Sequence, residues 1–103
     1  MSAMSDLTRL EASASEIAQL LKPLANERRI RLLLHLEVAG GEMAVEKIAV
    51  KLGIGQSALS QHLAKLRKSG VITARRAGHK LFYRITDAKA AALVGALRKG
   101  LEL

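Results

Sequence analysis

Amide and hydroxyl side chains recur along residues 56–68 at the spacing of one helix face. Leu59, Leu63 and Leu66 follow each other at intervals of four and three residues, which predicts an amphipathic helix with the leucines facing inward. Glutamine can pair bidentately with adenine, serine can bond several base edges, and a small alanine can meet a thymine methyl. The outward face would carry such side chains, namely Gln56, Ser57, Ser60, Gln61, Ala64 and Lys68. The segment is a candidate recognition helix for double-stranded DNA, with a solvated polar face as the plain alternative.

The charges around this helix favour the DNA interpretation. Residues 47–86 hold nine Lys or Arg and no Asp or Glu, whereas residues 1–46 hold five basic and seven acidic residues. The net charge of +8 therefore originates in the middle of the chain, and a polyanion is its natural partner. On the predicted recognition helix, Lys65, Arg67 and Lys68 are placed to contact phosphates, which fix register without reading sequence. His62 could donate to a phosphate or to a backbone carbonyl.

A second basic cluster lies at a predicted hairpin tip. Residues 71–76 and 81–85 are rich in β-branched and aromatic side chains, which predicts two strands joined by residues 77–80. Basic side chains at such a tip can enter a minor groove or hold phosphate. Those expected to do so are Arg75, Arg76, His79 and Lys80, and the alternative is a solvated turn with incidental charge.

A scaffold of helices must position these two clusters, and the pattern of the rest of the chain predicts such a scaffold. A short helix ending at Gly53 precedes the candidate recognition helix, so residues 44–69 form a helix-turn-helix and residues 71–85 form its wing. Pro23 is expected to end a first helix near residues 5–22, and Asn26 to cap a buried second helix carrying Ile30 and Leu34. A last helix spans about residues 87–101. The expected fold is a single mainly α winged helix-turn-helix domain over residues 1–103, with four helices, two strands and a final helix.

The helices at the two ends of the chain each carry an apolar stripe. On a short domain such stripes either complete the core or bury each other across a two-fold axis. We expect a homodimer, because two recognition helices about 34 Å apart can meet successive major grooves of a palindrome. The expected interface residues are Leu7, Leu10, Ala14, Ile17, Leu21, Val94, Leu97 and Leu101.

Several other classes of protein are disfavoured. The chain has no Cys, and its three His residues lack the i, i+3 or i, i+4 spacing of a zinc site, so no metal or other cofactor is expected. Ser60 and His62, two apart on a helix, point in different directions, and no other catalytic pattern is present, so no enzyme is expected. No apolar run is long enough to span a membrane and no export signal is visible, which predicts a cytoplasmic protein.

Three segments together resemble the ArsR/SmtB family of winged-helix repressors, over about residues 17–97. They are residues 21–30 (LKPLANERRI), residues 56–63 (QSALSQHL) and residues 75–83. The resemblance is nearest to the NolR/HlyU-like branch and implies a dimeric repressor. Metal sensors of the family carry a Cys-Val-Cys run where this chain has residues 44–46, or a His where it has Lys89. Some members of the branch carry a Cys at the position of Leu34. The resemblance therefore implies DNA binding without metal or thiol sensing.

The expected function is sequence-specific regulation of transcription, as a repressor at a palindromic promoter operator. One alternative is a winged-helix module that binds a protein and has little DNA specificity. Another is a packaging protein that binds any DNA, although packaging needs only charge and not the Gln and Ser face. The operator, the regulated genes and the effector, if there is one, are not encoded in a recognisable pattern.

Overall fold

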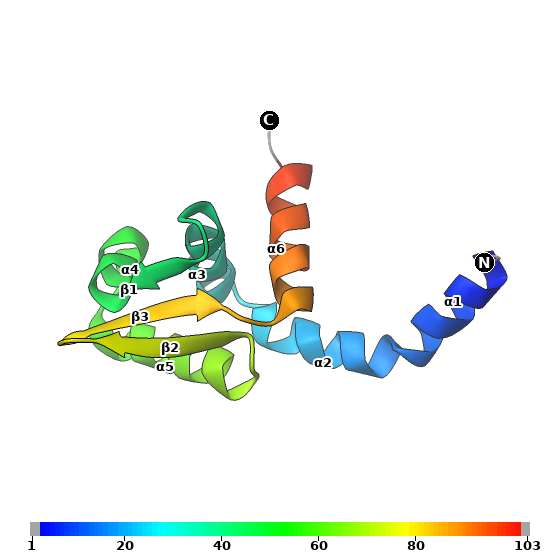
Figure 1. The fold of residues 1–103 in the computed structure, drawn as a ribbon, viewed down its shortest axis with the longest axis horizontal. Coiled ribbons are helices and arrows are strands. Elements are labelled where there is room, and N and C mark those ends of the chain that lie inside the picture. The colour runs from blue at the N-terminus through cyan, green and yellow to red at the C-terminus, as the bar shows by residue number, and fades with distance from the viewer. Residues whose placement is uncertain (1–2, 102–103) are drawn as a thin grey trace.

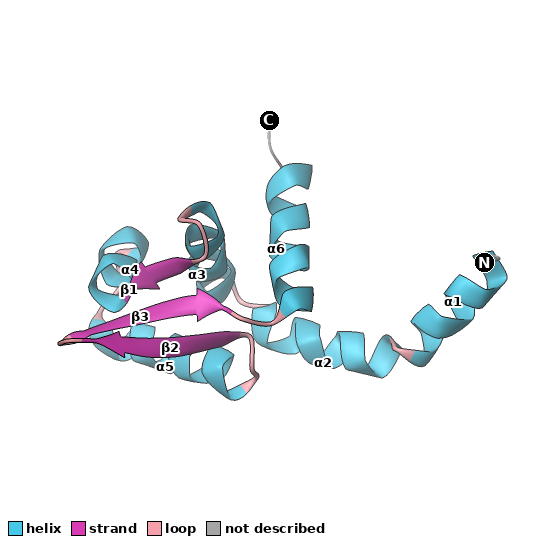
Figure 2. Cartoon of the chain, viewed as in Figure 1, coloured by secondary structure: helices cyan, strands magenta, loops and turns pink. Residues whose placement is uncertain are grey.

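The computed structural model describes residues 3–101 and shows a winged helical body with a helical arm (Figure 1). The arm consists of α1 (Ala3–Ala12) and α2 (Ala14–Leu24). The body contains α3 (Glu27–Val38), β1 (Glu42–Ala44), α4 (Val45–Leu52), α5 (Gln56–Lys68), β2 (Ile72–Ala77) and β3 (Lys80–Ile85). The final helix α6 (Ala88–Gly100) rises beside the C-terminal end of α2 (Figure 2). The winged helix-turn-helix fold is confirmed.

The core forms where α3, α4, α5 and α6 meet the inner face of the sheet. Leu32 and Leu36 of α3, Ile48 of α4 and Leu66 of α5 are completely buried there. Leu59 and Leu63 are buried with them, as the spacing of the leucines predicts. The apolar face of each helix is therefore used, and the opposite face of α5 is left in solvent.

The sheet has three strands in the order β1-β3-β2, all antiparallel. The hairpin of β2 and β3 is confirmed, with Ala77 opposite Lys80 and a two-residue turn at Gly78 and His79. Gly78 has φ of +63°, a left-handed conformation that glycine adopts without steric cost. The strand β1 was not expected. It pairs with β3 so that Glu42 lies opposite Arg84 and Ala44 opposite Phe82.

The prediction of one continuous helix before Pro23 is wrong in two respects. Ser13 interrupts the helix, and α1 and α2 diverge at this point (Figure 1). The Ser13 hydroxyl donates to the Arg9 carbonyl at 3.0 Å, a back-bond that commonly bends helices. Pro23 does not end α2, which continues through it to Leu24. A proline so near the end removes only a bond of the last turn.

The cap and the end of α3 agree with the sequence-based expectation, but its burial differs in part. The Asn26 side chain accepts from the Arg29 backbone N–H at 3.1 Å, and Gly40 and Gly41 after the helix both have positive φ. Ile30, expected in the core, is 37% exposed, and Leu34 is only partly buried. Both side chains line an apolar groove between α2, α3 and α6. Among residues 3–101, no helix is long and apolar enough to cross a membrane.

Candidate nucleic-acid interface

The helix-turn-helix consists of α4, a turn at residues 53–55, and α5. Gly53 caps α4 in the left-handed conformation, with φ of +65°, and its N–H donates to the Ala49 carbonyl at 2.9 Å. This turn brings the start of α5 to the surface. Gln56, Ser57, Ser60 and Gln61 are exposed there, and so are Ala64, Lys65 and Lys68 farther along the helix. The residues expected to contact bases thus all lie on the solvent side of α5.

The exposed face of α5 divides into two stripes. One stripe borders the wing (β2, β3 and their turn) across a groove of about 330 Å³, which Leu81 and Tyr83 also line. Its members are Gln56, Ser60, Ala64 and Arg67. The other stripe, set by helical spacing, contains Ser57, Gln61, Lys65 and Lys68. Arg67, expected with Lys65 and Lys68 to contact phosphates, is exposed and lies in this groove.

His62 differs from its neighbours because it is partly buried. Its Nδ1 lies 3.4 Å from Nη1 of Arg29, a buried arginine of α3. Burial is the largest cause that lowers the pKa of His62, followed by the positive charges of Arg29, Arg28 and Lys65. The imidazole is therefore neutral at pH 7 and has a partner inside the protein. This arrangement does not favour His62 as a phosphate contact.

The two arginines of the wing lie on opposite faces of the sheet. Successive side chains of a strand alternate between faces. Arg76, which is opposite Leu81 in the pairing register, shares the inner face with the buried Ile72 and Tyr83. This face looks toward α5, which packs against β2. The exposed Arg76 therefore lies on the same side of the sheet as the recognition helix, and His79 and Lys80 are exposed at the wing tip.

Arg75 lies on the outer face and is held by an acidic side chain. Its Nε donates to Oε2 of Glu42 at 2.8 Å and its Nη2 to Oε1 at 2.7 Å, while its guanidinium carbon lies 4.7 Å from the centre of the Phe82 ring. The hydrogen bond from Arg75 lowers the pKa of Glu42, an effect that outweighs the opposing effect of burial. Arg75 thus links β2 to β1 across β3, and it is less available to phosphate than the sequence suggested.

The residues expected at a dimer interface are mostly exposed. Those with large exposed side chains are Leu7, Leu10, Ile17, Leu21, Leu97 and Leu101, and Ala14 is exposed as well. Val94 is different. It is 3% exposed and belongs to the core, so it offers almost no surface to a second copy.

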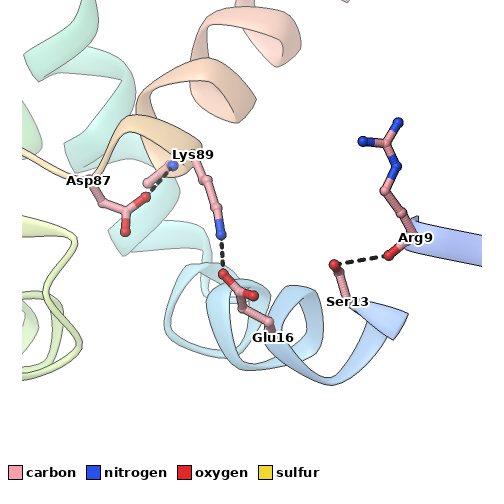
Figure 3. A network of polar contacts seen from close by, with 6 residues as sticks. Arg9, Ser13, Glu16, Asp87 and Lys89 are labelled. Atoms are coloured by element: carbon pink, nitrogen blue, oxygen red, sulfur yellow. Dashed lines mark hydrogen bonds and ion pairs between the residues drawn. The ribbon is translucent and has the colours of Figure 1, made fainter. Parts of the chain in front are cut away.

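Ionic contacts rather than metal ligands connect the helices at this end of the molecule. Lys89 of α6 pairs with Glu16 of α2, as Figure 3 shows, and Arg98 of α6 donates to Glu37 of α3 at 2.8 Å. The bond to Glu16 raises the pKa of Lys89. Within residues 3–101, no three His, Cys, Asp or Glu side chains gather as a metal site would need.

Comparison with known proteins places this geometry in a family. Residues 26–74 match the family described as bacterial regulatory protein, arsR family. The chain is 46% identical over 88 residues to the biofilm growth-associated repressor of Xylella fastidiosa, which covers 85% of this chain and 75% of that protein. The match confirms the resemblance that the motifs of residues 21–30 and 56–63 predict.

Solved structures agree. The transcriptional repressor BigR from Xylella fastidiosa is 42% identical, with a TM-score of 0.83 over 93% of this chain and 96% of that one. HlyU from Vibrio vulnificus is 34% identical, with a TM-score of 0.85 over 94% and 99%. NolR from Sinorhizobium fredii is 33% identical, with a TM-score of 0.74 over 98% and 94%. The chain therefore belongs to the ArsR family of winged-helix DNA-binding transcriptional regulators, which are not enzymes.

Proposed function

We propose that this protein is a homodimeric repressor that binds a palindromic promoter operator through α5 and the wing, and so excludes RNA polymerase. The polar, exposed face of α5 carries this proposal, because its amides and hydroxyls suit base edges and its leucines are fully used in the core. Gln56, Ser57, Ser60 and Gln61 read bases. Lys65, Arg67, Lys68 and Arg76 hold phosphates, with His79 and Lys80 at the wing tip.

The shape of the chain supports the dimer. Its radius of gyration is 15.4 Å, whereas a compact chain of this length has about 13 Å. The excess comes from the arm (α1 and α2), which extends away from the body (Figure 1). Ile17 and Leu21 of the arm, exposed by 41% and 44%, add to an apolar surface that a second copy would bury.

A groove beside the arm extends the apolar surface. It has a volume of about 350 Å³ and lies between α2, α3 and α6. Its lining is wholly apolar, formed by Leu21, Leu24, Ala25, Ile30, Leu33, Leu34, Leu93, Val94 and Leu97. A second copy related by a two-fold axis would cover this groove and the exposed stripes together. Such an interface would hold the two recognition helices in a fixed relation, as a palindrome requires.

Selection of genomic fragments with the purified protein tests the proposal. We expect enrichment of fragments that contain an inverted repeat upstream of a gene, and protection of both half-sites in footprinting. Affinity should fall steeply with salt, because bound Lys and Arg release counterions from the phosphates. Enrichment without any shared sequence would instead indicate packaging of DNA. Salt-insensitive binding of a protein, with no DNA shift, would indicate an interaction module.

A further inference from the structure

The buried guanidinium of Arg29 joins two parts of the molecule that the proposed function uses separately. Arg29 is 9% exposed, and it is the buried charged residue among those that the structure describes. Its Nε donates to the Pro23 carbonyl, at 2.5 Å, in the last turn of α2. The last carbonyls of a helix have no backbone N–H donor four residues farther along the helix. The Arg29 side chain provides a donor to one of them, the Pro23 carbonyl. On its other side, Nη1 lies 3.4 Å from His62 of α5.

The chemistry of this contact fixes the state of the imidazole. A guanidinium has donors and no acceptor, so the bond forms only when Nδ1 of His62 carries no proton. The single proton of the neutral ring is then on Nε2. The charged groups that lower the pKa of His62 are all cationic, namely Arg29 and Arg28 from α3 and Lys65 from α5. A second proton on His62 would remove the acceptor and place a positive charge beside these three.

We propose that Arg29 is a positioning residue for DNA recognition, which sets the orientation of α5 relative to the arm through its bonds to Pro23 and His62. This inference rests on the proposed function. If α2 contributes to the dimer interface, the link through Arg29 determines how each recognition helix is presented to its half-site. His62 then acts inside the protein as the acceptor of this link. Loss of the link should reduce discrimination between operator and random DNA more than it reduces binding to random DNA.

Four variants and a matched control test the link. Arg29→Met and His62→Leu remove the donor and the acceptor, whereas His62→Asn keeps an acceptor oxygen near the place of Nδ1. Loss of a bond to a charged group is expected to reduce the ratio of operator to random-DNA affinity by about tenfold. His62→Asn should retain most of that ratio, and Arg29→Lys should retain little, because an ammonium cannot span both acceptors. Arg31→Met removes an exposed arginine of the same helix and should leave the ratio unchanged.

The pH dependence of the operator-to-random affinity ratio distinguishes this link from a purely structural role of His62, which would leave that dependence unchanged. Lowering the pH below about 6.5, the ordinary pKa of His, should reduce the operator-to-random ratio of the wild type, because burial and the nearby cations hold the pKa of His62 under that value. The profile of His62→Asn should be flat over the same window. An identical pH dependence in both proteins would overturn the role of His62.

A measurement without DNA separates this inference from the proposed function. Nitrogen-15 NMR of the wild-type imidazoles at pH 7.5 should show His62 as the Nε2–H tautomer, and Arg29→Met should shift the Nδ1 resonance of His62, because the hydrogen bond to that atom is lost. A wild-type His62 with its proton on Nδ1, or an Nδ1 resonance unchanged in Arg29→Met, would refute the link even if the protein binds an operator well. Conversely, a protein that binds no DNA selectively would refute the proposed function, while the tautomer still decides the link. If Arg29→Met does not fold, the His62 pair and the wild-type spectrum decide the question.

Discussion

The two neighbouring arginines of the wing should differ in what they do to DNA binding, although the sequence presents them as equivalent. Arg76 lies on the sheet face that looks toward α5, whereas Arg75 lies on the other face and is held by Glu42. We therefore expect Arg76→Ala to remove a phosphate contact and Arg75→Ala to disturb the junction of β1, β2 and β3. The two variants remove the same side chain one residue apart, so each is the matched control of the other.

The size of the Arg76 effect follows from counterion release. Each phosphate contact contributes about 0.9 to the slope of log affinity against log salt concentration, so a dimer that loses two Arg76 contacts should show a slope less steep by about 1.8. By the same relation, one phosphate contact raises the affinity about fivefold when the salt concentration falls from 1 M to 0.15 M. Loss of both Arg76 contacts should therefore lower the affinity of the dimer about thirtyfold at 0.15 M salt. This loss should be nearly equal for operator and random DNA, because phosphate contacts carry no sequence information.

Fluorescence anisotropy with labelled operator and random duplexes, over a series of salt concentrations, measures both quantities. Arg75→Ala should change the slope much less than Arg76→Ala and should lower the melting temperature instead. Glu42→Gln keeps every cation and should lower the melting temperature without flattening the salt dependence. If Arg75→Ala flattened the slope as much as Arg76→Ala, Arg75 would contact phosphate in the complex and the assignment of the two sheet faces to separate roles would be wrong.

Three further outcomes are expected. Gln61→Ala should relax base preference at one position of each half-site by about 1–3 kcal/mol, with random-DNA affinity nearly unchanged, as measured by competition with single-base operator variants. Leu21→Glu and Leu97→Glu should each shift sedimentation toward the monomer, whereas Val50→Glu, at a side chain 79% exposed on α4, should not. The carboxyl of Glu42 has its pKa below the ordinary 4.5, so the unfolded chain takes up its proton first as the pH falls. The stability that the pair contributes should therefore be complete above about pH 4.5 and be lost below it, and Glu42→Gln should show a flatter dependence in urea denaturation measured across acid pH.

The elements that the sequence predicted well are those whose signals are local. Leu59, Leu63 and Leu66 define the inward face of α5 by their spacing alone, and the bounds of that helix follow from Gly55 before it and Gly70 after it. The wing is equally local, because two β-rich segments flank a two-residue turn with glycine in the first position. A tertiary fold was not needed to recognise either of them.

The features that the sequence did not predict depend on contacts between distant residues. The strand β1 is three residues long, too short for any alternation to be recognised, and it exists because β3 offers an edge to pair with. The stripe of the first helix continues in register across Ser13, so periodicity gives no indication of the bend that the serine hydroxyl makes. Arg29 resembles its exposed neighbours Arg28 and Arg31 in type, and only the packing of α2, α3 and α5 shows that it is buried.

Residues 47–86 contain no Asp or Glu, but in the folded chain an acidic side chain from outside this segment lies against it. Because β1 pairs with β3, Glu42 enters the segment from outside and binds one of its arginines on the face directed away from α5. Arg67 lies in the groove between α5 and the wing, and Arg76 lies on the wing face beside α5, whereas Lys80 and Arg84 share the outer face with Arg75. The acid thus pairs with a cation on the face directed away from α5, where the proposed complex has no phosphate, while Arg76 keeps its charge on the face where a phosphate is expected. A uniform basic patch would attract DNA in any orientation, whereas this distribution favours the orientation in which the glutamines and serines of α5 meet the bases.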